Sequence, residues 1–121
     1  MLKKTITFTD FDGEERTEDF YFNLTKAEIM EMEMGSAGGL VKRLEKIVQE
    51  KKQDEIIKEF KEIIRKAYGV KSPDGRKFIK SKEVFDDFAQ TEAYSELFMQ
   101  LATDGEAAAE FVNGIVPQIP Q

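Results

Sequence analysis

The residues closest to a known chemical motif are Asp10 and Asp12 beside Gly13. Closely spaced carboxylates followed by a glycine are typical of calcium-binding loops. Counted from Asp10, that loop requires Gly at its sixth position and Glu at its twelfth, but the chain has Glu15 and Tyr21 there. The spacing excludes the calcium motif, and Asp12-Gly13 predicts instead the tight turn of a β-hairpin.

Two other patterns could carry chemistry. General acid–base catalysis needs two carboxyl groups in a cleft with separated pKa values, whereas the pairs at 14–15, 31 and 33, and 86–87 have polar neighbours and should face water. The glycine-rich segment 35–39 precedes a predicted helix, but it lacks the Lys-Ser/Thr pair of a phosphate-binding loop and follows a helix rather than a strand. It predicts a hinge or a sharp turn. We therefore expect no catalytic and no nucleotide-binding residue.

The composition excludes further classes of function. The chain has 121 residues, no His and no Cys, so Ser-His and Cys-His nucleophiles, disulfides and the usual zinc sites are excluded. Its 18 basic and 24 acidic residues leave a net charge of -6, which disfavours binding to nucleic acid or to an anionic membrane. No apolar run is long enough for a signal or membrane segment. We expect a cytoplasmic protein that is not an enzyme and has no cofactor or metal.

The first elements are a hairpin and a short helix. Apolar and polar residues alternate on both sides of the turn, which predicts a β-hairpin over 2–22. Thr25 and Glu28 have the spacing of a capping box, in which each side chain binds the backbone amide of the other. They predict a helix over 26–34, which the glycine-rich segment ends.

Two helical stripes follow, over 40–52 and 54–68. The second contains Ile56, Ile57, Phe60, Ile63 and Ile64, which recur with the period of an amphipathic helix. The two segments predict a central antiparallel helical hairpin, and one longer bent helix is the alternative. Asp54 is suited to the N-cap of the second helix and Gly69 to its C-terminal cap.

The remainder is a turn followed by further helices. Around Ser72-Pro73-Asp74-Gly75 we expect a short strand pair or a packed loop. Helices are predicted over 82–90, 92–103 and 106–113, with Ser81 and Thr91 as N-caps and Gly114 as the stop. The tail 115–121 contains two prolines and should be extended and mobile. The fold class is α+β and mostly helical: one domain over 1–114, with the N-terminal β-hairpin packed on a bundle of about five or six helices.

Methionines occupy an unusual share of the first helix. Met30, Met32 and Met34 spread over a wider arc than one core stripe requires. Methionine is pliable and suits surfaces that accept irregular apolar partners, but it also fills gaps in cores. Core packing beside the glycine-rich segment is the favoured interpretation, and a binding surface is the alternative.

Several stretches, in this order, resemble one family over nearly the whole chain. They are ITFTDFDG (6–13), EDFYFNLTKAE (18–28), YGV (68–70), SPDGR (72–76), FAQTEAY (88–94) and AAAEFVNGIVP (107–117). Together they are similar to the tail assembly chaperones of long-tailed, siphovirus-type bacteriophages or prophages of Gram-positive bacteria.

The resemblance implies a small helper in the host cytoplasm that is absent from the mature virion. Such proteins bind the tape-measure protein, keep this long helical chain soluble and help to recruit tail-tube subunits; self-association into a homo-oligomer is also open. A long amphipathic client should be met by apolar surface that can repack. The residues expected to form this surface are Met30, Met32, Met34, Phe111, Val112 and Ile115. The alternatives are a structural component of the phage tail or head, and an acidic inhibitor of a host protein.

Overall fold

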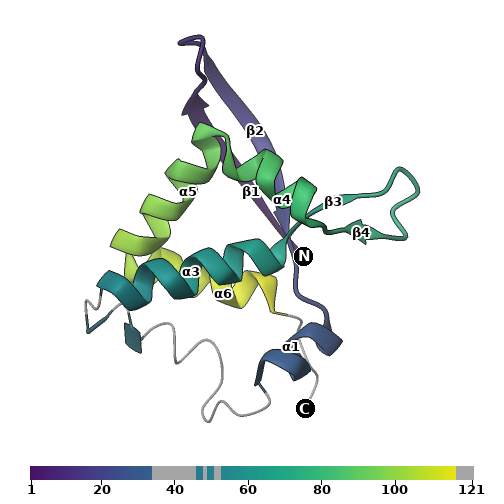
Figure 1. Ribbon diagram of the computed structural model, residues 1–121, viewed down its shortest axis with the longest axis vertical. Coiled ribbons are helices and arrows are strands. Elements are labelled where there is room, and N and C mark those ends of the chain that lie inside the picture. The colour runs from purple at the N-terminus through teal and green to yellow at the C-terminus, as the bar shows by residue number, and fades with distance from the viewer. Residues whose placement is uncertain (34–45, 48, 51–52, 117–121) are drawn as a thin grey trace.

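The computed structural model describes residues 1–33, 46–47, 49–50 and 53–116. An N-terminal β-hairpin and five helices dominate this part, which confirms the predicted α+β, mostly helical class (Figure 1). The elements are β1 (Leu2–Thr9), β2 (Glu15–Phe22), α1 (Lys26–Glu33), α3 (Gln53–Ala67), β3 (Tyr68–Lys71), β4 (Phe78–Ile79), α4 (Lys82–Ala89), α5 (Glu92–Thr103) and α6 (Gly105–Ile115).

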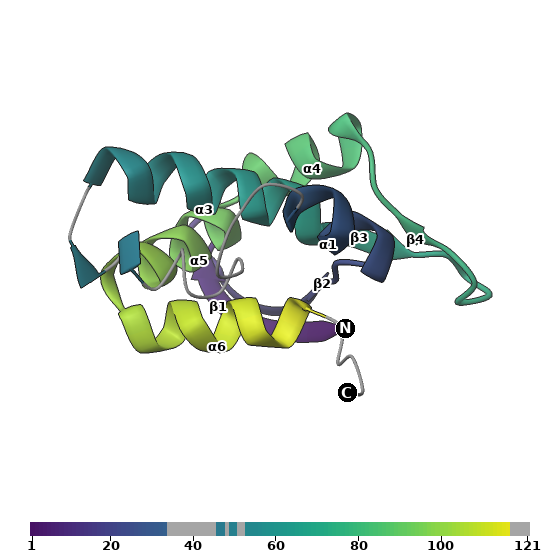
Figure 2. The ribbon, with the colours of Figure 1, turned by 90° about the horizontal axis from the view of Figure 1, so that it is seen from below.

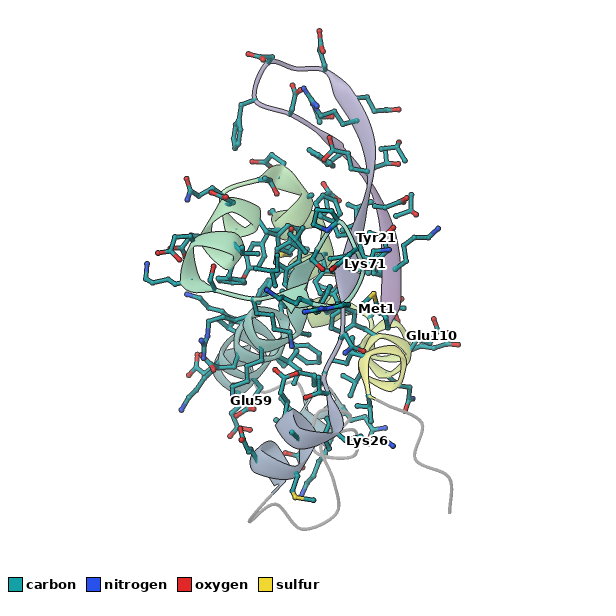
Figure 3. All side chains as sticks on the ribbon, turned by 90° about the vertical axis from the view of Figure 1, so that its right-hand side faces the viewer. Met1, Tyr21, Lys26, Glu59, Lys71 and Glu110 are labelled. Atoms are coloured by element: carbon teal, nitrogen blue, oxygen red, sulfur yellow. The ribbon has the colours of Figure 1, made fainter. Side chains whose placement is uncertain are left out.

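The N-terminal hairpin forms as predicted. β1 and β2 pair antiparallel along their whole length, from Leu2 opposite Phe22 to Thr9 opposite Glu15. Gly13 occupies the turn with a φ of 85°, which only glycine adopts readily. Figures 1 and 3 show that the turn end of the hairpin extends beyond the helices.

A second hairpin extends the first. β3 pairs with β2 and β4 pairs with β3, so the strand order is β1-β2-β3-β4 and all pairs are antiparallel. The strand alternative for the segment around 70–80 is thus confirmed. The C-cap prediction for Gly69 is wrong, because α3 ends at Ala67 and Gly69 lies in β3. A Cβ on Gly69 would lie 2.9 Å from the Ile79 carbonyl oxygen, so close strand contact explains this glycine.

The predicted caps at Thr25, Ser81 and Thr91 are confirmed. Thr25 donates its amide to Glu28 Oε1 at 2.8 Å, and the Glu28 amide donates to Thr25 Oγ1 at 3.1 Å. Ser81 caps α4 and Thr91 caps α5 through their hydroxyl oxygens. Asp54 lies in the first turn of α3 instead of preceding it. Each confirmed cap satisfies amides that have no partner within the helix.

One side of α3 lies in the core. Its residues Ile56, Phe60, Ile63, Ile64 and Ala67 are at most 2% exposed, whereas Ile57 is 50% exposed and does not belong to the buried stripe. Ile57 lies one position, and so about 100° around the helix, from the buried Ile56. The helix predicted over 40–52 lies mostly outside the described residues, and so does its pairing with α3.

Aromatic side chains join the sheet to the helices. The Phe22 ring lies 5.2 Å from that of Phe111 on α6 and 5.9 Å from that of Phe88 on α4, centroid to centroid. Tyr68 at the start of β3 stacks on Phe88 at 4.3 Å. These contacts bring the N-terminal hairpin and α6 together around one core, and Figure 2 shows α6 beside β1.

The structure corrects the predicted end of the last helix. α6 continues through Gly114 to Ile115, whose side chain is fully buried and whose carbonyl accepts a hydrogen bond from the Leu24 amide at 3.0 Å. Gly114 is close-packed instead of terminating the helix, because a Cβ there would lie 3.0 Å from the side chain of Leu2. The predicted mobile tail therefore cannot begin at 115, and residues 117–121 lie outside the described part.

Candidate functional site

The acidic residues nearest to the calcium motif build the hairpin turn. The Asp10 carboxylate accepts hydrogen bonds from the amides of Asp12 and Glu14, each at 2.9 Å, and from Arg16 Nε at 2.6 Å. The Arg16 hydrogen bond, more than any other contact, holds the pKa of Asp10 below its usual value. In the described residues no three acidic side chains are grouped so that they could hold a metal ion. Asp10 thus organises the turn.

The other carboxylate pairs lie at the surface. Glu14, Glu15, Glu31 and Asp87 are exposed, and Asp86 accepts a hydrogen bond from Lys82 at 2.7 Å. The Glu33 side chain and the glycine-rich segment 35–39 lie outside the described part. None of the described members has the enclosed surroundings that separate the pKa values of an acid–base pair.

Three of the residues expected to bind a client are in the core. Phe111 is 2% exposed, Val112 is 1% exposed and Ile115 is fully buried. Their positions on α6 face Phe22 and the other buried side chains, because the apolar stripe of α6 packs inward. This corrects the expectation that they form a client-binding surface.

Met30 differs from these residues because it faces outward. Its side chain is 69% exposed on α1, whereas the preceding Ile29 is only 6% exposed. The Met32 side chain and all of Met34 lie outside the described part. For Met30 the core interpretation is wrong, and the surface alternative remains.

Lys80 holds α1 against the rest of the molecule. Its Nζ donates to the Asn23 carbonyl at 2.7 Å and to both carboxylate oxygens of Glu28, at 2.8 and 2.9 Å. Partial burial raises the pKa of Glu28, but the hydrogen bonds from Lys80 and from the Thr25 amide outweigh burial and lower it. The beginning of α1 is therefore fixed while Met30 stays exposed.

A basic groove of about 560 Å³ lies between α1, α3 and the beginning of α4. Its lining includes five cationic side chains, which are Lys61, Arg65, Lys66, Lys80 and Lys82. Glu28 and Asp86 are the acidic residues of the lining, and Phe85 contributes an apolar wall. In an acidic protein this is a local reversal of charge. No sequence pattern predicts this groove, because its cations come from two segments that only the fold brings together.

The exposed Phe11 in the turn of the N-terminal hairpin is the second feature that was not predicted from the sequence. Phe11 is 78% exposed there, the largest exposure among the large apolar side chains of the described residues. The carboxylates of Asp12, Glu14 and Glu15 are exposed and have no ion-pair partner in the described part of the chain. The available signal in the sequence was a phenylalanine between Asp10 and Asp12 in the predicted turn.

The comparisons with known proteins identify the family. A family model described as phage tail assembly chaperone matches residues 1–119. No match was found among the curated proteins or among the solved structures. No helix in the described ranges is long and apolar enough to cross a membrane. Because the family model covers nearly the whole chain, this protein belongs to the phage tail assembly chaperone family.

Proposed function

We propose that this chaperone binds the tape-measure protein of its phage, keeps that long helical chain soluble and helps to recruit tail-tube subunits. Its family membership supports a chaperone role in tail assembly. The phage or prophage would be of the siphovirus type in a Gram-positive host. The chaperone would act in the host cytoplasm, without catalysis, and would be absent from the mature virion.

The observation that carries the proposal is the exposed Met30 on an anchored helix. Lys80 and Glu28 fix the beginning of α1, so the helix that carries Met30 is in place before a client binds. Methionine adapts to irregular apolar partners because it is unbranched and polarisable. We propose that Met30, with Met32 and Met34 on the same segment, contacts apolar side chains of the client.

The first experiment is co-expression with the tape-measure protein of the same genome. The soluble and co-purified fractions of the client are compared with and without the chaperone. We expect a soluble complex with the chaperone and aggregated client without it. A client that remains insoluble, or that is soluble but does not co-purify, contradicts the proposal.

A matched pair of variants tests the surface. Met30→Ser should reduce the co-purified client several-fold, because it removes an apolar contact without disturbing the core. Met99→Ser is the control, since Met99 is similarly exposed at 55% but lies on α5. Equal effects of the two variants would exclude a specific role for Met30. Circular dichroism melting confirms that both variants are folded.

Analysis of purified virions by mass spectrometry tests the structural alternative. A chaperone that leaves the particle should be undetectable there, whereas a tail or head component should be present in a fixed ratio to the tube protein. Stoichiometric presence would therefore overturn the proposed absence from the virion.

A further inference from the structure

We propose that the hairpin turn of one copy docks into the basic groove of a second copy, through a contact between two different surfaces. The turn is defined here as residues 10–15, and the groove is the one lined by α1, α3 and the beginning of α4. This inference concerns self-association and does not depend on the proposed client.

The turn is prepared for binding by its own hydrogen bonds. Asp10 holds the backbone of the turn through the amides of Asp12 and Glu14, and Arg16 in turn holds Asp10. Phe11 is left 78% exposed on this fixed loop. Because the loop is already ordered, docking costs less conformational entropy than binding by a flexible segment.

The groove matches the turn in charge. Lys61 and Lys66 are exposed and have no ion-pair partner in the described part of the chain. The unpaired charges of the turn are carboxylates and those of the groove are ammonium groups. Their attraction would steer the two copies into this orientation and disfavour contact between like surfaces.

The groove also offers an apolar wall. Phe85 lines it and is 7% exposed, and the groove volume of about 560 Å³ leaves space for an entering side chain. Phe11 is the exposed aromatic side chain that the turn provides. Aromatic side chains are enriched at the centre of protein interfaces, and polar residues surround them at the rim.

The two surfaces lie on different parts of the molecule. Figure 1 shows the turn of the N-terminal hairpin at one extremity, away from the end of α3 and the beginning of α4, and Figure 3 shows the same separation. A turn on the paired strands β1 and β2 does not reach the groove of its own chain. Each copy therefore retains one free turn or one free groove after pairing, and the contact can repeat to form a ring or a filament.

Sedimentation velocity of the wild-type chain provides the first test. We expect association that increases with protein concentration and weakens between about 0.05 M and about 0.5 M NaCl, because salt screens exposed charges. A wild-type protein that remains monomeric over the accessible concentrations at low salt would overturn the proposal.

Two variants distinguish this contact from a symmetric one. Phe11→Ser with Asp12→Lys disables the turn, and Lys61→Glu with Lys66→Glu disables the groove. Each variant alone should be monomeric. Their mixture should form a heterodimer and nothing larger, because one intact turn and one intact groove remain. A mixture that stays monomeric contradicts the proposal, as do single variants that associate like the wild type.

A charge-matched control accompanies the groove variant. Lys3→Glu with Lys58→Glu changes the net charge equally at two exposed positions outside the groove, and it should associate like the wild type. If this control also dissociates, the net charge rather than the groove determines association, and the proposal fails. Far-ultraviolet circular dichroism shows that the variants are folded. No tape-measure protein is used, so this result is independent of the client experiment.

Discussion

Lys80 shows how one side chain connects segments that are distant in sequence. It satisfies the Asn23 carbonyl after β2 and the Glu28 carboxylate in α1. We predict that Lys80→Met lowers the free energy of unfolding by about 1 to 2 kcal/mol, because a partly buried carbonyl and a carboxylate lose their donor. The pKa of Glu28 should also rise. Urea denaturation and carboxyl NMR titration measure the two effects.

Lys82→Met is the matched control for this prediction. The Lys82–Asp86 pair is also short, at 2.7 Å, but the Lys82 side chain is 86% exposed, compared with 22% for Lys80. An exposed ion pair contributes roughly 0 to 1 kcal/mol to stability, so Lys82→Met should lower the free energy of unfolding less than Lys80→Met does. Equal losses would show that Lys80 acts only as a surface cation.

Two glycines provide a second prediction at the residue scale. A Cβ on Gly69 would lie 2.9 Å from a backbone oxygen in β4, whereas on Gly114 it would meet the movable end of Leu2 at 3.0 Å. We expect Gly69→Ala to destabilise the protein by about 1 to 3 kcal/mol, as overpacking does. Gly114→Ala should destabilise the protein less, because alanine is more favourable than glycine within a helix by about 1 kcal/mol. Thermal melts compare the two, and a larger loss at Gly114 would contradict this explanation.

At the scale of elements, the helix caps are the local signals that determine where helices begin. Ser81 Oγ accepts the Val84 amide at 3.1 Å and so caps α4. Ser81→Ala should cost about 1 kcal/mol, because the amide loses its partner. Ser95→Ala, at an exposed position within α5, should be neutral or slightly stabilising. Chemical denaturation of both variants measures the difference, and equal effects would show that the cap is unimportant.

Most predictions that rest on local signals agree with the structure, and the N-cap predicted at Asp54 is an exception because α3 begins at Gln53. The hairpin turn at Asp12-Gly13 and the caps at Thr25, Ser81 and Thr91 depend on neighbouring residues, and all form as expected. Gly69 was misassigned because the decisive contact comes from β4, ten residues later. A glycine after a helical stripe has the same local pattern whether it caps the helix or enters a strand.

At the scale of the whole molecule, the buried side of α3 should determine whether the chain folds. Ile63 is 2% exposed, and Ile63→Asp would place a carboxylate in the core, which we predict abolishes the cooperative melt. Ile57→Asp is the control on the same helix, because Ile57 is 50% exposed. It should retain most of the wild-type melting temperature. If Ile63→Asp retains that temperature as well, α3 does not pack as described.

The charge distribution predicts how stability depends on pH. Hydrogen bonds from Arg16, Arg65 and Ser72 are the leading causes that lower the carboxyl pKa values of Asp10, Glu62 and Asp74. Such groups contribute stability that is full above the unfolded pKa of about 4 and is lost as the pH falls through the lower folded value.

The chain has no His, so no imidazole titrates near neutral pH. The melting temperature should be constant from about pH 6 to about pH 9 and should fall below about pH 4. Calorimetry in a series of buffers checks this profile. A pronounced change near about pH 6.5 would contradict it.

Whether a predicted binding residue is exposed also depends partly on nearby residues and partly on residues distant in sequence. For Met30 the sequence left two interpretations open, core packing and a binding surface, because methionine content is visible without a structure. It placed Phe111, Val112 and Ile115 on a surface as well, although they are buried. An apolar stripe shows that a helix has one apolar side, but the partner that covers this side is set by residues distant in sequence.

The sequence by itself determined the fold class, the hairpin turn, the caps at Thr25, Ser81 and Thr91, and the absence of His and Cys chemistry, because these depend on composition or on residues a few positions apart. Tertiary structure alone decided that β3 extends the sheet, that α6 lies in the core and that Lys61 and Lys66 meet Lys80 in one groove. The physical reason is that burial and net local charge depend on which segments meet in space.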